Sequence, residues 1–393
     1  MRPLDGITVI ALEQAVSAPF CTRQLADLGA RVIKVERPVS GDFARGYDGR
    51  VRGLSSFFVW ANRSKESLTL DLKHERAAEI LSRLLRKADV LIQNLAPGAA
   101  ARLGLSFEAL APAFPSLIVC DISGYGDGGP YRDKKAYDLL VQSESGFLSV
   151  TGTPEEPAKA GCSIADISAA SYALSNVLAA LLQRGRTGRG SRVEISMFES
   201  MVEWMSAPLY YAFEGSPPPA RRGAAHATIY PYGPFPTGDG RTVMLGLQNE
   251  REWHAFCTSV LRQPELAMDQ RFCTNARRVE SREALRALIV AAFADLTAQQ
   301  VLSLLDSAQI ANAQLNTMAD VWAHSQLRAR HRWRPVETPS GAVPMLLPPG
   351  MPADTFEPRM DPVPALGQQT EAILAEIGFT ATEIERLHVE SVV

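Results

Sequence analysis

The sequence lacks the features that mark secreted, membrane-embedded and zinc-binding proteins. Its five cysteines are widely spaced and none belongs to a Cys-x-x-Cys pair, which argues against a disulfide framework and a zinc site. No stretch reaches about 18 uninterrupted apolar residues, so we expect no membrane-spanning helix. The opening residues, Met-Arg-Pro-Leu-Asp-Gly, lack the apolar core of a signal peptide. We therefore expect a cytoplasmic protein with no membrane partner.

An excess of positive charge is also missing. The chain has 40 Lys and Arg against 43 Asp and Glu, for a net charge of −3. Nucleic acid is therefore not an expected partner, and an anionic ligand must be held by a local group of cations. With 46% hydrophobic and 21% charged residues, the 393 residues have the composition of a globular protein of two or three domains.

Short catalytic motifs with a known mechanism are absent as well. There is no Walker A loop, no HExxH and no GxSxG, and the six histidines show no metal-ligand spacing, so we expect no metal. Residues 124–129 match G-x-G-x-x-G, but Pro130 and a polar run follow them instead of a helix. The segment therefore predicts a mobile loop beside a pocket and not a dinucleotide site.

What the first half does contain is an alternation of strands and helices. Apolar runs rich in β-branched residues predict buried strands at 7–12, 31–36, 67–72, 89–93 and 117–122. Helical patterns lie between them at 19–29 and 74–87, and residues 164–183 are long enough for a buried helix. Strand, helix and strand within about thirty residues imply parallel pairing, so the fold class is a doubly wound α/β sheet.

The second half changes character near residue 214. Proline and glycine crowd residues 214–240, which predicts a linker or an ordered crossing between domains. Residues 241–330 are helical in pattern, and the Pro-rich residues 334–365 lead to a terminal helix near 368–377. We therefore predict the first part of a large domain at 1–213, a small domain at 225–330, and a return to the large domain at 331–393.

Cations gather around the first three predicted strands. The carboxyl ends of parallel strands are where such sheets bind ligands, and a cation there can hold a nucleotide phosphate. For any single one of these residues, a solvated surface role is the alternative. The group consists of Lys34, Arg37, Arg45, Arg63, Lys65 and Lys73.

Two acids stand in contexts that favour chemistry. Asp166 lies in SIADISAA, where a helix begins among small apolar residues. It is either the N-cap of that helix or a partly desolvated carboxylate nucleophile, and Asp138 in KAYDLL is a second candidate. His226 lies beside Arg221 and Arg222 in the Pro-rich crossing, where the three side chains form either a small carboxylate site or a solvated face.

Several long segments, in order along the chain, resemble the class III CoA-transferases, the family of formyl-CoA transferase, the carnitine CoA-transferases and α-methylacyl-CoA racemase. They are PLDGITVIALEQAVSAPFCTRQLADLGARVIKVERPVSGD, NRSKESLTLDLK, NLAPGAAARLGL, GYGDGGPY, KAYDLL, RTGRGSRVEISMFE and PALGQQTEAILAEIGF. The resemblance implies a large Rossmann-like domain built from both chain ends, a smaller domain, and an interlocked homodimer.

The resemblance also implies a mechanism. It assigns the nucleophile to Asp166, whose carboxylate forms a mixed anhydride with the acyl group and then a thioester with coenzyme A, the carried substrate. No metal is required. The positions that match CoA-binding residues of the family are Val16, Ser17, Arg37, Leu70, Lys73, Asn94, Leu95, Arg102, Lys135 and Tyr137.

The reaction type follows from one position. Racemases of the family carry a histidine where this chain has Tyr137, and a tyrosine with a pKa of about 10 is a poor general base. We therefore favour a transferase, with intramolecular CoA transfer and α-methylacyl-CoA racemisation as alternatives.

The substrate class is implied by a second set of positions. The glycine-rich loop of the oxalate enzymes is missing, and HATIYPYGPF with QNEREW resembles the branch that acts on C4–C5 dicarboxylates. Such acceptors include itaconate, mesaconate, citramalate and glutarate, often with succinyl-CoA as donor. The acceptor-binding candidates are Asp138, Arg222, His226 and Arg251.

Overall fold

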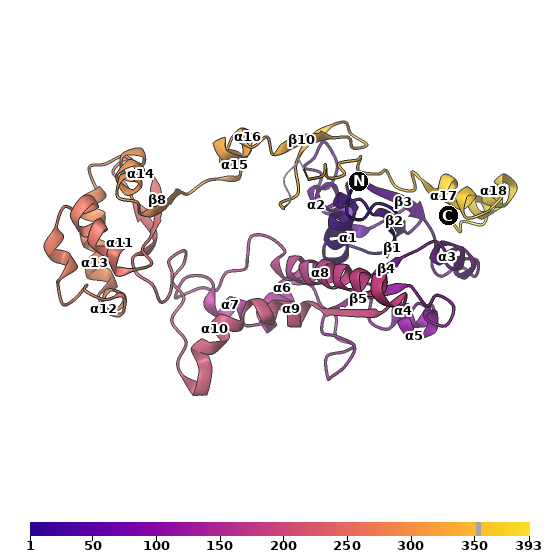
Figure 1. The fold of residues 1–393 in the computed structure, drawn as a ribbon, viewed down its shortest axis with the longest axis horizontal. Helices are drawn as coiled ribbons and strands as arrows, with labels where there is room; N and C mark the ends of the chain where they lie inside the picture. The colour runs from indigo at the N-terminus through magenta and orange to yellow at the C-terminus, as the bar shows by residue number, and fades with distance from the viewer. Residues whose placement is uncertain (351–354) are drawn as a thin grey trace. The chain divides into compact units, whose positions relative to one another are not determined.

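A computed structural model describes residues 1–350 and 355–393 (Figure 1). The chain divides into two compact units. Unit 1 consists of Met1–Gly146, Ala160–Ser206 and Leu327–Val393, and unit 2 of Phe147–Lys159 and Ala207–Gln326. Both chain ends therefore belong to unit 1, and residues 147–159 belong to unit 2.

Unit 1 is built on a six-stranded sheet. Its strands are β1 (Thr8–Leu12), β2 (Arg31–Glu36), β3 (Lys65–Thr69), β4 (Val90–Gln93), β5 (Ile118–Ser123) and β6 (Arg192–Ser196). Their order is β3-β2-β1-β4-β5-β6 and every neighbouring pair is parallel, which confirms the predicted Rossmann-like α/β fold class. The chain reverses its direction of growth between β1 and β4, and ligands of such sheets bind at the carboxyl ends of the strands flanking this point.

The helices of unit 1 bury an apolar face against this sheet. In α3 (Ala77–Leu85), the residues Ile80, Leu81 and Leu84 recur at helical spacing and are buried. The C-terminal helices α17 (Thr370–Glu376) and α18 (Ala381–Val389) place Ile373 and Leu387 in the same core. Figure 1 shows these two yellow helices beside the indigo β3 and α3, so the end of the chain completes the core begun at its start.

The helix α8 (Ile164–Thr187) is, among the described residues, the single helix long and apolar enough by length and composition to cross a membrane. It packs against α1 (Ser17–Asp27), α9 (Met197–Trp204), β5 and β6 of unit 1. Small residues, including Ala165, Ala169 and Ala173, are buried at this contact. Packing inside unit 1 thus buries part of α8, where the sequence predicts a buried helix.

Unit 2 contains a three-stranded antiparallel sheet of β7 (Tyr232–Pro236), β8 (Thr242–Gly246) and β9 (Ala311–Gln314). The main helices are α11 (Glu250–Ala255), α12 (Asn275–Glu280), α13 (Arg282–Phe293) and α14 (Ala298–Ser307), which enclose a core around Trp253 and Phe293. Of the two alternatives for residues 214–240, a linker or an ordered crossing, the stretch of β7 is ordered. Pro234 and Pro236 are tolerated there because β7 is an edge strand, where a missing N–H leaves no partner unbonded.

Shorter elements complete the description. They are the helices α2 (Ser56–Ala61), α4 (Ala99–Arg102), α5 (Phe107–Leu110), α6 (Asp138–Glu144), α7 (Phe147–Val150), α10 (Ser206–Leu209), α15 (Met318–Trp322) and α16 (Ser325–Ala329), the strands β10 (Trp333–Val336) and β11 (Val343–Leu346), and the short turns η1 (Phe43–Gly46), η2 (Tyr210–Gly215), η3 (Phe256–Val260) and η4 (Pro264–Ala267).

Candidate active site

Asp166 lies at the start of α8, but it is not the N-cap. Ser163 holds that position and makes no capping bond with its side chain. The capping is supplied by Asp138 at the start of α6, whose Oδ1 accepts a hydrogen bond from the Ala165 amide at 2.8 Å. The N-cap alternative for Asp166 is therefore wrong, because another carboxylate caps the helix and leaves Asp166 available.

Asp138 is itself held in place by Gln142, one turn later on α6. The Gln142 side chain is fully buried and donates to Asp138 Oδ2 at 2.6 Å. Its carbonyl oxygen accepts from the Ala160 amide at 2.9 Å, in the segment that leads to α8. The two side chains together fix the backbone that carries Asp166.

The carboxylate of Asp166 faces the start of α1. Ser17, the first residue of α1, donates hydrogen bonds to it from both its hydroxyl and its backbone N–H. The Ser17 hydroxyl accepts in turn from Asn94 Nδ2 at 3.2 Å, and Asn94 lies directly after β4. A helix N-terminus favours an anion, so α1 and Ser17 together stabilise the ionised form of Asp166.

Burial of Asp166 favours the neutral form of its side chain and so opposes the effect of Ser17. The pKa of Asp166 is raised to about 7, first by burial and then by the negative charge of Asp138, while the bonds from Ser17 oppose the rise. A carboxylate with such a pKa is still largely ionised at slightly alkaline pH, and it is more basic than an ordinary aspartate. Both properties suit a nucleophile in acyl transfer.

Two tyrosines lie near this carboxylate. The pKa of Tyr47 is raised to about 12 by burial and by the nearby Asp42, Asp166 and Tyr137. Tyr47 follows η1, and Tyr137 directly precedes α6 with its side chain mostly exposed. The Tyr47 phenol therefore stays protonated at neutral pH and remains a hydrogen-bond donor.

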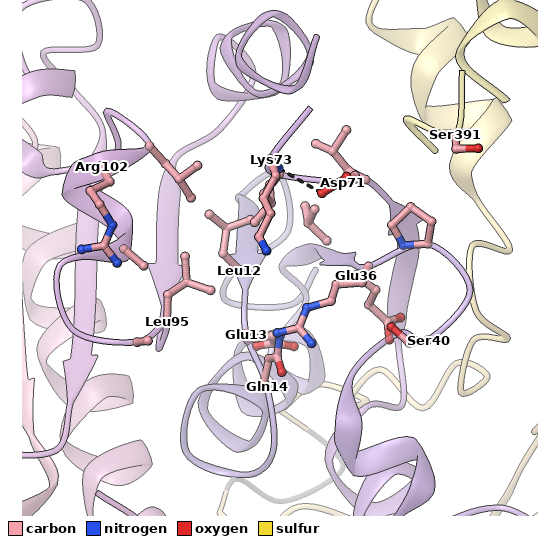
Figure 2. A pocket seen from close by; sticks show the side chains of 18 residues that line it. Leu12, Glu13, Gln14, Glu36, Ser40, Asp71, Lys73, Leu95, Arg102 and Ser391 are labelled. Atoms are coloured by element: carbon pink, nitrogen blue, oxygen red, sulfur yellow. Dashed lines mark hydrogen bonds between the residues drawn. The ribbon is translucent and has the colours of Figure 1, made fainter. Parts of the chain in front are cut away.

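A cavity of about 810 Å³ opens at the carboxyl ends of β1 to β4, where the strand order predicts a ligand (Figure 2). Leucines from these strand ends give it an apolar wall, while Lys73 extends toward its centre and Arg102 lies at its side (Figure 2). Of the residues predicted to bind CoA, it is lined by Arg37, Leu70, Lys73, Leu95 and Arg102.

A hydrogen-bonded turn links this cavity to Asp166. Gln14 lines the cavity, and its backbone N–H and C=O are both bonded to the Asn94 side chain, at 2.8 and 2.9 Å. Asn94 also bonds Ser17, which bonds Asp166. One amide thus connects the Gln14 turn of the cavity wall to the serine that faces Asp166, and all of these residues belong to unit 1.

Comparison with known proteins shows to which family a chain with this fold and these residues belongs. The model of CoA-transferase family III matches residues 4–370. The chain belongs to CoA-transferase family III.

Two of its relatives are named for dicarboxylic acids. The mouse protein named succinyl-CoA:glutarate CoA-transferase is 32% identical over 382 residues, covering 96% of this chain and 87% of the relative. The acetyl-CoA:oxalate CoA-transferase of Acetobacter aceti is 35% identical over 331 residues, covering 84% and 85%. A crystal structure of a CaiB/BaiF family protein from Brucella suis superimposes with a TM-score of 0.83 at 33% identity, covering 96% and 99%.

The remaining residues predicted to bind CoA do not line this cavity. Val16 is buried at the start of α1, so only its backbone can face a ligand, as the resemblance implies. Lys135 is exposed in the loop before α6. That loop includes the G-x-G-x-x-G match and borders a second cavity of about 260 Å³ through Gly126 and Asp127, which agrees with the predicted position beside a pocket.

Three of the acceptor-binding candidates belong to unit 2. Arg222 and Arg251 are exposed, and Arg251 lies on α11. His226 stacks on Tyr232, and its Nδ1 accepts from the backbone of Thr228 and Ile229 at 3.2 and 3.0 Å. Only Nε2 of His226 is thus left to donate to a ligand, and the acceptor roles of these three residues stay predictions.

Four of the six clustered cations are structural. Lys34 and Lys65 are fully buried and share Glu13, Arg45 pairs with Glu36 at 2.7 Å, and Arg63 pairs with Asp27 at 2.8 Å. Of the six clustered cations, Arg37 and Lys73 are the two that line the cavity. Sequence reasoning missed Gln142, Tyr47 and Asp42 near Asp166, because nothing in their local pattern distinguishes them from surface polar residues.

Proposed function

We propose that this enzyme transfers CoA from succinyl-CoA to a small dicarboxylic acid through covalent intermediates on Asp166. The observation that carries the proposal is the half-buried Asp166 carboxylate, with a pKa of about 7, bonded to Ser17 at the start of α1. The Asn94 hydrogen bonds connect Ser17 to the wall of a cavity whose cations suit the phosphates of CoA, which supports the proposal.

The first half-reaction has two steps. A carboxylate oxygen of Asp166 attacks the thioester carbonyl of succinyl-CoA, the C–S bond breaks, and the CoA thiolate leaves a mixed anhydride on Asp166. The thiolate then attacks the aspartyl carbonyl of the anhydride, and succinate leaves with the electrons of the broken C–O bond. The product is an aspartyl-CoA thioester.

The second half-reaction reverses these steps with the acceptor. A carboxylate of the dicarboxylic acid attacks the aspartyl thioester and expels the thiolate, which then attacks the acceptor carbonyl of the new anhydride. Asp166 returns as a carboxylate. Every bond formed is an acyl bond of similar energy to the one broken, so the cycle needs no external energy source.

Ser17 and Asp138 support these steps in different ways. The N–H and O–H of Ser17 act on the Asp166 carboxylate, and we propose that they also stabilise the negative charge that develops on the aspartyl carbonyl oxygen when the thiolate attacks. Asp138 fixes the start of α8 through Ala165 and raises the basicity of Asp166 by its charge.

The cavity is proposed to hold the nucleotide part of CoA. Its leucine wall suits the adenine ring, and the exposed Arg37, Lys73 and Arg102 suit the phosphates. Leu70 comes directly after β3 and Leu95 lies two residues after the end of β4, and so they extend this wall along two strand ends.

For the acceptor we propose a C4–C5 dicarboxylate such as glutarate, itaconate, mesaconate or citramalate. The two relatives described above are named for glutarate and oxalate, which share two carboxylates and differ in length. A second carboxylate needs a cation, and Arg222 and Arg251 are the candidates, with His226 as a neutral donor. An interlocked homodimer and a cytoplasmic location are part of the same proposal.

A panel of acceptors tests this function. With succinyl-CoA as donor, we expect glutarate and the other C4–C5 diacids to be converted, and oxalate and the monocarboxylate butyrate to be converted at least about tenfold less well, because each lacks the contact to a distal carboxylate. Preference for oxalate or butyrate would overturn the assignment. Deuterium incorporation at Cα of 2-methylacyl-CoA in heavy water would instead support the racemase.

A further inference from the structure

The carboxylate of Asp42 joins the two loops that reach Asp166. Its side chain is fully buried, and Oδ1 accepts hydrogen bonds from the amides of Ala15 at 3.0 Å and Ala44 at 2.9 Å. Oδ2 accepts a hydrogen bond from the Lys34 ammonium at 2.8 Å. One side chain thus connects β2, the loop after β1, and η1.

The first of these loops carries Ser17. Ala15 adopts a φ of 63°, a left-handed conformation that residues with a Cβ rarely adopt. The bond from its amide to Asp42, together with the bond from the Gln14 amide to Asn94 at 2.8 Å, holds the chain in this shape. Ser17 follows two residues later, so the direction of its donors depends on the turn at Ala15.

The second loop carries Tyr47. Asp42 is the N-cap of η1, and its side chain bonds the Ala44 amide within that turn. Tyr47 comes directly after η1, and its phenol is close enough to Asp166 and Tyr137 for their charges to act on it. Both loops that approach Asp166 from outside α6 and α8 are therefore anchored on the same carboxylate.

The charge of Asp42 is matched inside the fold. Lys34 is fully buried and bridges Asp42 to Glu13 at 3.3 Å, and Glu13 in turn holds Lys65 at 2.6 Å. Loss of the Asp42 charge would leave Lys34 with Glu13 alone, which Lys65 already shares. The network thus fixes the Asp42 carboxylate between the two loops.

We propose that Asp42 is a positioning residue for acyl transfer: it sets the distance and direction of the Ser17 donors at Asp166. This inference rests on the proposed role of Asp166 as nucleophile. On this proposal Asp42 touches no substrate, but its carboxylate affects kcat in addition to any effect on folding.

The test is Asp42→Asn, assayed by exchange of labelled succinate into succinyl-CoA, which needs no knowledge of the acceptor. Asn presents an N–H₂ group to Lys34 and loosens the turn at Ala15. We expect kcat of the folded variant to fall about 10- to 100-fold, by more than KM rises, because small displacements at a reacting centre cost rates of this size. We also expect the acid limb of the pH–rate profile to move to higher pH, since the Ser17 bonds favour ionised Asp166 and Asp138 opposes it.

The control is Asp239→Asn in unit 2. Asp239 also ties loops together, since it accepts from the Thr237 hydroxyl at 2.6 Å and the Ala298 amide at 3.2 Å. This variant is expected to keep the wild-type kcat and pH midpoint. If Asp42→Asn does not fold, Asp42→Asn with Lys34→Met removes the unmatched ammonium and is assayed in the same way.

Failure of the positioning role of Asp42 can be distinguished from failure of the proposed function. An unchanged acid limb in a folded Asp42 variant would overturn the positioning role, and so would failure of both variants to fold, because Asp42 would then be structural only. If the wild-type enzyme forms no adduct on Asp166, the proposed function fails first, whatever Asp42→Asn does.

Discussion

At the scale of the residue, the site depends on how one carboxylate is kept reactive. Burial and Asp138 raise the pKa of Asp166, and Ser17 restrains the rise. The sequence indicated Asp166 and Asp138 as acids near a helix start, but it left the N-cap alternative open. Only the structure shows that Asp138 caps α8, because that bond joins residues 27 positions apart.

The raised pKa of Asp166 has a consequence for stability. The folded-state pKa of about 7 lies above the unfolded value of about 4, so the native state holds the proton more tightly. Ionisation of Asp166 therefore lowers the free energy of unfolding progressively as pH rises from about 4 to about 7. We expect Asp166→Asn to melt at a higher temperature than the wild type at pH 8, with the difference shrinking toward pH 4. Thermal melts across this range measure it, and a less stable Asp166→Asn at pH 8 contradicts the pKa.

Removal of the Ser17 hydroxyl tests the opposing effect. Ser17→Ala keeps the backbone donor and loses one hydrogen bond to the ionised carboxylate, so the pKa of Asp166 rises. We expect the acid limb of the exchange rate between labelled succinate and succinyl-CoA to move to higher pH. A matched change, Ser175→Ala on the exposed side of α8, should leave that limb in place. An unchanged profile for Ser17→Ala would show that the hydroxyl does not act on Asp166.

At the scale of the element, the site is assembled where parallel strands end. The regular apolar runs predicted five of the six strands of the unit 1 sheet, since buried strands are short and rich in β-branched residues. The same reasoning could not separate Lys73, which lines the cavity, from Lys34 and Lys65, which are buried in ion pairs. Partners such as Glu13 and Asp42 are brought to these lysines by the fold, and local sequence does not reveal them.

The cations at the strand ends give a further prediction. We expect Lys73→Met and Arg102→Met each to raise KM for succinyl-CoA by about tenfold or more with little change in kcat, since a charge-assisted hydrogen bond contributes about 1.5–3 kcal/mol. Lys87→Met is the control, because Lys87 pairs with Glu376 away from the cavity. Initial-rate kinetics with succinyl-CoA and free succinyl-pantetheine measure the effect. Equal losses with both donors would contradict a role in binding the nucleotide.

At the scale of the whole molecule, the two ends of the chain meet in unit 1. The Val392 carbonyl accepts from the Asp71 amide at 2.8 Å, Val392 is fully buried, and Ser391 lines the cavity. Composition and periodicity do not predict this return, because contacts between residues more than 300 positions apart leave no local pattern. The family resemblance implied it.

Shortening the C-terminus tests this return. Deletion of residues 391–393 removes the buried Val392 and part of the cavity wall, so we expect KM for succinyl-CoA to rise and the melting temperature to fall. Deletion of Val393 alone is the control and should have a much smaller effect on both. Wild-type KM in the longer deletion would show that the terminal segment is not part of the CoA site.

The most direct test of the central claim is mass spectrometry of the enzyme incubated with succinyl-CoA, followed by peptide mapping after hydroxylamine or borohydride treatment. We expect an adduct on the peptide that contains Asp166, a mass consistent with an aspartyl-CoA thioester before treatment, and no adduct in Asp166→Asn. Unmodified Asp166 in an enzyme that demonstrably binds CoA would contradict covalent catalysis by this residue.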